Sequence, residues 1–562
     1  MPLAFMYATL SSLLHEVLNK VCHAILRPHW GEGLETLTSL ARTCEPAVGA
    51  IWKTIPDISV IIYTLPQGLW LETHIEITGD ENLYRFFRRR LSFQRPPVQS
   101  DFAKLKHYAH LIRHVTYPNT CFIPPDILSA LAIHFPAGTL LPNIRTLVYR
   151  YLASPQSDPN QSLPVLFGPK LRSLNLICSA PCQMDVERAG AKIFDCIRAL
   201  PCMCPGLSAL NVRMDPERKL PLITVVPDII PSFQDLTHVL VNRIGLDFSA
   251  ISHLARLQNL NTLNAYLFDE VTTQADVQSL ASTSTSRPVY FPSLQEIWLT
   301  HRFLSLCTSL LKLVSSPDLD EVMFSTSKES GFNCTSEDVS ELCLELSSHP
   351  SLTCIIVSVN SPVTGPRFDS TTFKPLLMLP HLSVVDIDIA HPIDIDGELI
   401  AYMAFIWRKL TRLSLCVARA PSPLSQLDPV AAFYPAATLL DLVSFALWCP
   451  ELQWIGLPVN TDLSRVVDVL ETRPGRGTAL SEMFLDVGLS AAHDPVPVAA
   501  FLSDLFPGLQ GVRTAWRGVR EEDMNADLER YVGRRRNIVA RWNEVAELVG
   551  DFTTVRKQER NW

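Results

Sequence analysis

The chain has 562 residues, of which 47% are hydrophobic and 19% are charged, and its formal net charge is −9 at pH 7. This composition allows a large core and excludes a globally disordered chain, and the negative charge argues against nucleic acid as the main partner. The longest apolar runs are well short of the roughly 18 residues that cross a bilayer, so we expect no membrane span.

The first 55 residues predict short helices. The apolar side chains of Ser11–Leu26 recur at three- and four-residue steps, so they share one helical face. A glycine-containing break, Arg27–Gly33, separates this segment from Leu34–Ile55, which predicts one or two further helices. No basic leader precedes the apolar part, so we do not expect a signal peptide.

Residues 56–110 are expected to form bridging helices and an N-terminal cap. The segment Leu83–Phe93 contains the basic run Arg88–Arg90. We interpret this run as the solvated face of a helix, with contact to an acidic or phosphate group as the alternative. A further helix is expected at Ser100–Tyr108, where it leads to the first repeat.

Between residues 111 and 515 a short phrase recurs: Leu-x-x-Leu-x-Leu, often with a proline two residues before its first leucine. Fourteen copies give a mean spacing of roughly 30 residues, which is typical of a repeat architecture. The first apolar residues of the copies are Ile112, Ile144, Leu171, Leu207, Leu236, Leu260, Leu294, Leu319, Leu352, Leu382, Leu410, Leu452, Leu480 and Leu509.

The alternation of side chains along a strand explains this phrase. Positions 4 and 6 point to one side and become buried, whereas positions 3, 5 and 7 face the other side. The proline ends the preceding helix and favours extended backbone before it. Apolar residues at helical spacing lie between the phrases, as in Ser336–Ser348, Ala437–Trp448 and Pro497–Phe506. Each unit therefore predicts a strand followed by a helix, and neighbouring units must stack to bury their apolar faces.

This pattern resembles leucine-rich repeats of the long, irregular, helix-containing type. The expected fold class is α/β: a leucine-rich-repeat solenoid over residues 111–515, with a curved parallel sheet and outer helices. A small helical domain over residues 1–55 precedes it, and a charged helical cap over residues 516–562 closes its end. The alternative is an ordinary α/β domain with leucine-rich strands.

Three N-terminal pieces, Leu13–Val21, Leu37–Trp52 and Ile55–Pro66, resemble a divergent F-box, as found ahead of leucine-rich repeats in fungal proteins. The resemblance implies the substrate-recognition subunit of a Skp/cullin/F-box ubiquitin ligase, cytoplasmic or nuclear and without a cofactor. Its partners would be a Skp-family adaptor and, through it, a cullin. The residues expected to bind the adaptor are Leu14, Val17, Leu18, Leu37, Leu40 and Trp52. The alternative is a cap on the repeats of an interaction scaffold that has no ligase role.

A protein target, whose identity the sequence does not give, is expected on the sheet face formed by positions 3, 5 and 7. Trp298 and Trp454 would be exposed anchors, since tryptophan is enriched at binding hot spots. Four carboxylates would form an acidic patch suited to a basic target segment. The predicted target-binding residues are Glu296, Trp298, Glu321, Asp386, Asp388, Arg412 and Trp454. The alternative is a register shift that places the tryptophans in the core.

We expect no catalytic residues, because no G-x-S-x-G elbow is present and Arg473–Gly477 lacks the end of a phosphate-binding loop. The cysteines lie mostly in apolar contexts, as in a reduced intracellular protein. One group departs from the spacing of zinc knuckles, so we expect thiols there, with zinc as the alternative. It consists of Cys178, Cys182, Cys202 and Cys204.

Overall fold

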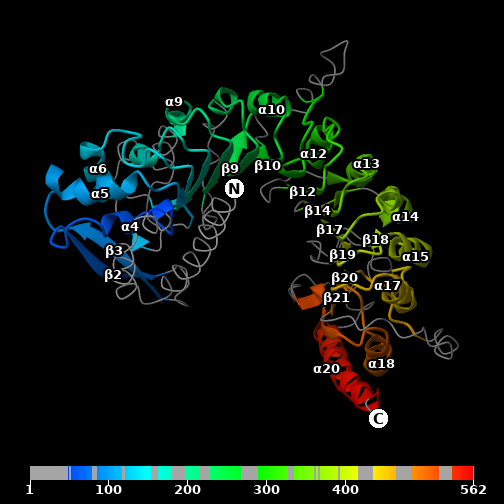
Figure 1. Cartoon of the computed structure of the whole chain (residues 1–562). Coiled ribbons are helices and arrows are strands. Elements are labelled where there is room, and N and C mark those ends of the chain that lie inside the picture. Colours follow the sequence, from blue (N-terminus) through cyan, green and yellow to red (C-terminus); the bar gives the residue numbers. More distant parts are fainter. Residues whose placement is uncertain are drawn as a thin grey trace, which may run out of the picture. The chain divides into compact units, whose positions relative to one another are not determined.

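The chain divides into two compact units, Met1–Leu260 and Asn261–Trp562, both drawn in Figure 1. The structure, a computed structural model, describes residues 49, 52–78, 85–116, 121–123, 125–152, 163–179, 197–214, 228–267, 277, 289–326, 334–359, 363–364, 367–389, 393–415, 435–463, 483–517 and 535–560.

Parallel strands form the sheet of the first unit, and their order in the sheet is their order along the chain. These strands are β1 (Thr54–Ile55), β4 (His114–Val115), β6 (Thr146–Leu152), β7 (Ser173–Ser179), β8 (Ala209–Met214) and β9 (His238–Leu246). The helical segments between them are α4 (Ser59–Ile62), η1 (Gln99–Phe102), α5 (Ala103–Ala109), α6 (Pro125–His134), η2 (Leu163–Leu166), α9 (Leu200–Met203), η3 (Ile230–Ser232) and α10 (Phe248–Ala255).

The second unit repeats this plan with parallel strands in chain order. Its strands are β10 (Thr262–Leu267), β11 (Glu296–His301), β12 (Glu321–Thr326), β14 (Cys354–Val359), β17 (Val384–Ile389), β19 (Arg412–Leu415), β20 (Trp454–Gly456), β21 (Met483–Asp486) and β22 (Leu509–Arg513). Its helical segments include α12 (Leu304–Leu311), α13 (Ser336–Leu346), α14 (Ser370–Phe373), η4 (Lys374–Met378), α15 (Gly397–Ile406), η6 (Leu439–Asp441), α17 (Leu442–Trp448) and α18 (Pro495–Leu505).

Each of the fourteen phrase copies leads into one of these strands, which confirms the predicted α/β leucine-rich-repeat solenoid. Within the second unit, helices α12, α13, α14, α15 and α17 lie along one side and the strands along the other (Figure 1). Two short strand pairs also form, β13 (Cys334–Thr335) with β15 (Val363–Thr364), and β16 (Phe368–Asp369) with β18 (Ile393–Asp394).

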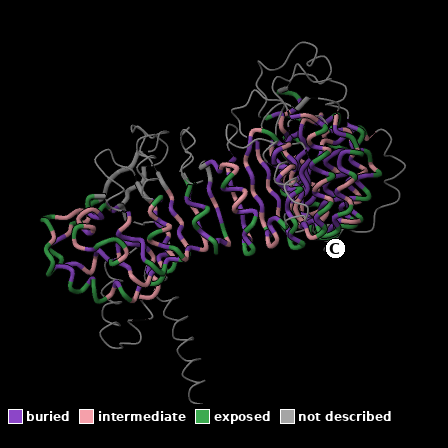
Figure 2. The backbone as a smooth tube through the Cα atoms, turned by 90° about the horizontal axis from the view of Figure 1, so that it is seen from above, coloured by how far each residue is buried: buried purple, intermediate pink, exposed green. Residues whose placement is uncertain are grey.

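Burial alternates along the strands as expected, and Figure 2 shows this as alternating colours. In β11, Ile297 and Leu299 are 0% and 2% exposed, whereas Glu296 and Trp298 are half-buried. Strands β12, β14 and β17 repeat the same order. The buried set packs between the sheet and the helices, so the opposite face of the sheet carries the polar side chains.

Side-chain caps fix where the helices begin. Asp247 accepts a hydrogen bond of 2.8 Å from the backbone N–H of Ala250 at the start of α10, and Asp396 caps α15 in the same way. At α13, Thr335 and Asp338 form a reciprocal capping box. These bonds satisfy N–H groups that the first helical turn leaves without a partner.

The prediction of a helix at Leu83–Phe93 is wrong. Residues Arg85–Phe93 form strand β3, which pairs antiparallel with β2 (Trp70–Thr78), and β5 (Cys121–Phe122) joins β3 in parallel. The sequence of β2 alternates threonine or isoleucine with polar residues, which favours a strand. Pairing with β2 therefore determines the structure of Arg85–Phe93, although the local sequence around Arg88–Arg90 indicated a helix. The helix expected near Ser100–Tyr108 is present as η1 and α5.

A long helix, α20 (Arg535–Arg560), packs on α18 and β22 near the C-terminal end of the second unit. Its buried face includes Trp542, which is 1% exposed. The indole N–H groups of Trp516 and Trp542 both donate to the carbonyl oxygen of Ser490, at 3.3 and 2.8 Å. In the described part of the chain, no helix combines the length and apolar character needed to cross a membrane.

Candidate functional site

The seven predicted target-binding residues all lie on the polar face of the second unit's sheet, and all are half-buried. Strand pairing places Glu296 of β11 beside Glu321 of β12, and Arg412 of β19 beside Trp454 of β20. Trp298 and Trp454 are therefore not core residues, as a shift of register would have made them.

Five side chains on strands β17 to β22 form what we call the Trp454 cluster. Its members are Asp386, Arg412, Trp454, Phe484 and Arg513. The Nη2 and Nε atoms of Arg412 donate to Oδ2 of Asp386 at 2.7 and 2.9 Å. The guanidinium carbon of Arg412 also lies 4.7 Å from the centroid of the Trp454 ring. A charge-assisted hydrogen bond and a cation–π contact thus hold one side chain in place.

Arg513 approaches the same indole from another strand. Its guanidinium carbon lies 4.8 Å from the Trp454 centroid and 5.7 Å from the Phe484 centroid, and the two rings are 5.9 Å apart. In strand order, β19 and β22 lie on opposite sides of β20. The two guanidinium groups therefore reach Trp454 from opposite directions along the sheet.

Two donors of the cluster are unsatisfied within the described residues. Arg513 is exposed and has no carboxylate at salt-bridge distance, and the buried indole N–H of Trp454 has no acceptor. A stacked guanidinium still presents its N–H edge to a ligand, and a buried unpaired donor costs free energy. The arrangement therefore favours a ligand that brings acceptor oxygens.

Carboxylates surround these arginines. Burial raises the pKa of Asp486, while the backbone N–H of Gly488 and the charges of Arg513 and Arg412 oppose the rise, and the charge of Asp388 adds to it. Gly488 donates to Oδ1 of Asp486 at 3.0 Å. The face around Trp454 thus carries both signs of charge, which suits a ligand that itself carries both.

The predicted acidic side chains fall into two groups. Glu296 and Glu321 are direct neighbours on adjacent strands. Burial, and then the charge of Glu296, raise the pKa of Glu321, while the nearby indole N–H of Trp298 opposes the rise. Asp386 lies on β17, beyond the intervening strand β14, and is ion-paired with Arg412. The glutamate pair, Glu296 and Glu321, is therefore a site of like charge that a basic side chain would stabilise.

The predicted adaptor-binding surface lies almost wholly outside the described residues, since these do not include Leu14, Val17, Leu18, Leu37 and Leu40. Trp52 is described and half-buried. Its ring stacks on Tyr108 of α5, with centroids 4.4 Å apart and an interplanar angle of 14°. Trp52 therefore packs within the chain, against the first unit.

No protein-family model matches the chain, and no curated protein matches it significantly. One solved structure that resembles it is the crystal structure of the Rad7 and Elc1 complex in yeast. The match has a TM-score of 0.31 and 12% sequence identity, and it covers 75% of this chain and 83% of that chain. A TM-score this low carries no argument about function.

The described thiols do not favour catalysis. Cys204 is buried and donates to the carbonyl oxygen of Gly168 at 3.4 Å, and burial raises its pKa to about 12. Such a thiol is protonated at neutral pH and is neither a nucleophile nor a ready metal ligand. Cys202 is exposed, and the side chains of Cys178 and Cys182 lie outside the described residues. Across the described ranges, no three His, Cys, Asp or Glu side chains are grouped to hold a metal ion.

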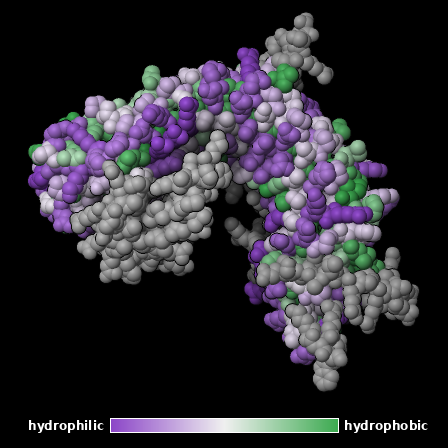
Figure 3. Space-filling model, viewed as in Figure 1, coloured by the Kyte–Doolittle hydropathy of each residue, from purple (hydrophilic) through white to green (hydrophobic). Residues whose placement is uncertain are grey.

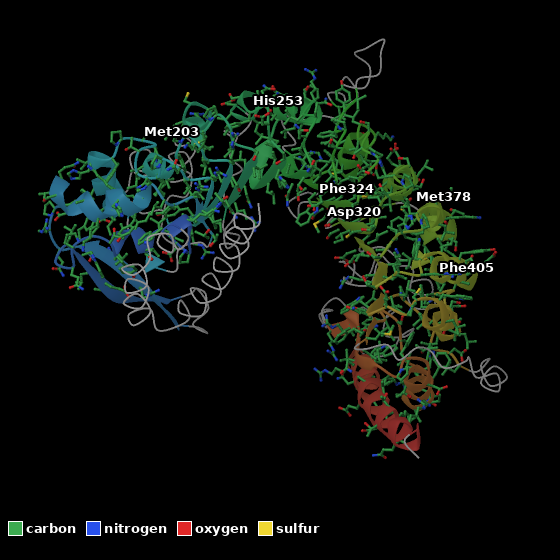
Figure 4. All side chains as sticks on the ribbon, viewed as in Figure 1. Met203, His253, Asp320, Phe324, Met378 and Phe405 are labelled. Atoms are coloured by element: carbon green, nitrogen blue, oxygen red, sulfur yellow. The ribbon has the colours of Figure 1, made fainter. Side chains whose placement is uncertain are left out.

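The outer helices also carry an aromatic patch that was not predicted from the sequence. Phe405 of α15 and Trp448 of α17 meet edge to face at 5.4 Å and are 49% and 42% exposed. The guanidinium carbon of Arg408 lies 5.0 and 5.3 Å from the two ring centroids. Figure 4 shows Phe405 and Met378 on the side away from the strands, and Figure 3 shows hydrophobic atoms along this side. Tyr402 and Phe405, which lie off the buried face of α15, were the available signal.

Proposed function

We propose that this chain holds a protein target on the polar sheet face of its second unit, as the substrate-recognition subunit of a Skp/cullin/F-box ubiquitin ligase. The Trp454 cluster carries the proposal of target binding, because it combines a stacked aromatic anchor with unsatisfied donors. The resemblance of residues 1–55 to a divergent F-box supports the ligase role.

The charges on the face define the target segment. The glutamate pair favours a basic side chain, and the exposed Arg513 favours a carboxylate. Glu321 and Trp454 stand four strand steps apart, on the order of 19 Å at roughly 4.8 Å per step. An extended segment of about six residues spans that distance, at roughly 3.3 Å per residue. The target is thus an extended segment with a basic residue near one end and an acidic residue near the other.

A truncation of the N-terminal residues tests whether the chain binds the Skp-family adaptor. Removing residues 1–48 leaves Trp52, its partner Tyr108 and strand β1 in place, so the first unit keeps these contacts. We expect this truncation, and Leu14→Asp or Leu18→Asp in the full chain, to abolish co-purification with the Skp-family adaptor. Leu344→Asp, at a leucine that is 62% exposed on α13, is the matched control. Undiminished adaptor binding by the truncated chain would disprove the F-box assignment.

One observation favours a second function, that of an interaction scaffold without a ligase role. The stacking of Trp52 on Tyr108 is what a helical cap on the repeats would use. In this case residues 1–48 stabilise the first unit, and their removal lowers its melting temperature. Loss of the adaptor at unchanged stability favours the ligase subunit, whereas loss of stability without adaptor binding by the full chain favours the scaffold.

A further inference from the structure

Four cations occupy the same position in four successive strands of the first unit. Lys53, Arg113, Arg145 and Arg172 each come directly before a strand: β1, β4, β6 and β7. The backbone N–H of each arginine donates to the carbonyl oxygen of the preceding cation, at 2.9, 2.7 and 2.8 Å along the series. The four residues, called here the basic ladder, are therefore spaced by one strand step each, roughly 4.8 Å.

The charges of this ladder are not neutralised within the described residues. Arg113, Arg145 and Arg172 are exposed and Lys53 is half-buried, and none of the four has a carboxylate at salt-bridge distance. The guanidinium of Arg172 donates to the carbonyl oxygen of Gly206 at 2.6 Å, which fixes its position. Three of these charges converge on His114, since burial and then Lys53, Arg145 and Arg113 lower its pKa.

The fold does not require cations at this position. The next residues of the same backbone ladder in the first unit are Ser208 and Thr237. In the second unit, the position is held by Asn261, Gln295, Asp320, Thr353, Ser383, Thr411 and Gln453. Like charges on neighbouring strands destabilise a sheet. A run of four cations, at a position that elsewhere carries neutral residues or Asp320, therefore points to an anionic ligand.

We propose that the basic ladder binds an acidic peptide segment of a partner protein, extended across the starts of strands β1, β4, β6 and β7. Guanidinium groups match carboxylates with paired hydrogen bonds. The ladder spans about 14 Å over its three strand steps. Side chains on one side of an extended peptide are roughly 6.7 Å apart, so the ladder can bind two or three acidic side chains. The net charge of −9 repels a polyanion such as a nucleic acid more strongly than a short peptide that carries two or three carboxylates. This surface is separate from the target-binding residues, which belong to the second unit.

The test uses the full chain and three labelled probes in fluorescence anisotropy. The probes are a peptide of alternating glutamate and serine, its glutamine–serine counterpart, and a single-stranded oligothymidylate. We expect the acidic peptide to bind at micromolar to submillimolar concentration and the glutamine peptide not to bind. The double variant Arg113→Gln/Arg145→Gln should weaken acidic-peptide binding at least tenfold. The control Lys104→Gln/Arg256→Gln removes the same charge from exposed positions of the first unit and should change it less than twofold.

Thermal unfolding separates binding from structure. Removing two stacked like charges should leave the melting temperature of the ladder variant unchanged or raised. A lowered melting temperature would assign these arginines a structural role and overturn the proposal. Equal weakening by the ladder and control variants would also overturn it, because the attraction would then be non-specific. Tighter, ladder-dependent binding of the oligothymidylate would replace the acidic peptide with nucleic acid as the ligand.

Discussion

Arg412 lies over the ring of Trp454, with 4.7 Å between its guanidinium carbon and the ring centroid. Asp386 holds the same guanidinium through two hydrogen bonds to one oxygen. These contacts order the proposed Trp454 anchor within the chain itself, and an ordered side chain loses less conformational entropy on binding a partner.

The first prediction concerns this anchor. Trp454→Ala should weaken binding of the target protein by about 2 kcal/mol, the scale of a binding hot spot; the target is the partner that still co-purifies after removal of residues 1–48. Trp298→Ala should act in the same direction, and Trp448→Ala, on the outer helix α17, is the control. The measurement is a binding isotherm beside a melting curve. Parallel loss of affinity and stability would mean that Trp454 supports the sheet rather than the target.

The second prediction concerns Trp407, which directly follows α15 and is 0% exposed. Trp407→Ala should lower the free energy of unfolding by roughly 3–5 kcal/mol, the range for large-to-small core changes. Trp407→Phe should lower it less, because the buried indole N–H has no acceptor among the described residues. Urea denaturation measures both, with the half-exposed Trp448→Ala as control. Equal losses for the alanine and phenylalanine variants would contradict this account.

The third prediction uses the raised pKa of Glu321, which burial and the charge of Glu296 cause. A carboxyl whose folded-state pKa is raised binds more protons when folded, so its contribution to stability falls as pH rises above the ordinary value of 4.5. Glu321→Gln should therefore be more stable than wild type at pH 7, and the difference should shrink as the pH falls through the raised folded-state pKa towards 4.5. Glu451→Gln, at an exposed site, is the matched control. Chemical denaturation at several pH values decides, and a less stable glutamine variant at pH 7 would refute the prediction.

The fourth prediction concerns His114, whose pKa burial lowers first and Lys53, Arg145 and Arg113 lower further. Arg145→Gln should raise that pKa, as measured from the imidazole proton resonances, and Arg256→Gln should not change it. Because the folded-state pKa is depressed, the unfolded chain takes up the proton first as pH falls below 6.5. Wild-type stability should therefore decline from pH 6.5 down to the folded-state pKa, and this decline should be smaller in Arg145→Gln. An unchanged His114 pKa in Arg145→Gln would show that the arginine does not act on it.

The repeat phrase predicted the solenoid because each of its positions has a local physical cause. Leu294, Ile297 and Leu299 are buried at positions 1, 4 and 6, and the half-buried positions between them carry Glu296 and Trp298. Strand β3 could not be predicted in this way, because its structure depends on pairing with another strand, β2. A local pattern of basic and apolar residues does not reveal a pairing across a loop.

The candidate site was only partly predictable for a related reason. Side chains alternate between the two faces of a strand, so the seven predicted target-binding residues could be placed on the polar face from sequence. The contact of Arg513 with Trp454 spans two strands, and the register shifts between Met483 and Phe484 on the way. The basic ladder was equally hidden, because up to 60 residues separate neighbouring members, Lys53 and Arg113, that the sheet brings together.

The alternation along β11, β12, β14 and β17 also bears on how such a protein can change over generations. In each strand, alternate residues are buried in the core, and the residues between them do not pack in the core. Under the proposed function, a substitution at Trp298 or Asp386 would change which partner binds, while the buried Ile297 and Ile387 would still stabilise the fold. Under that proposal, single substitutions on the polar face would give new specificities, because each of them leaves the buried positions of the strands unchanged.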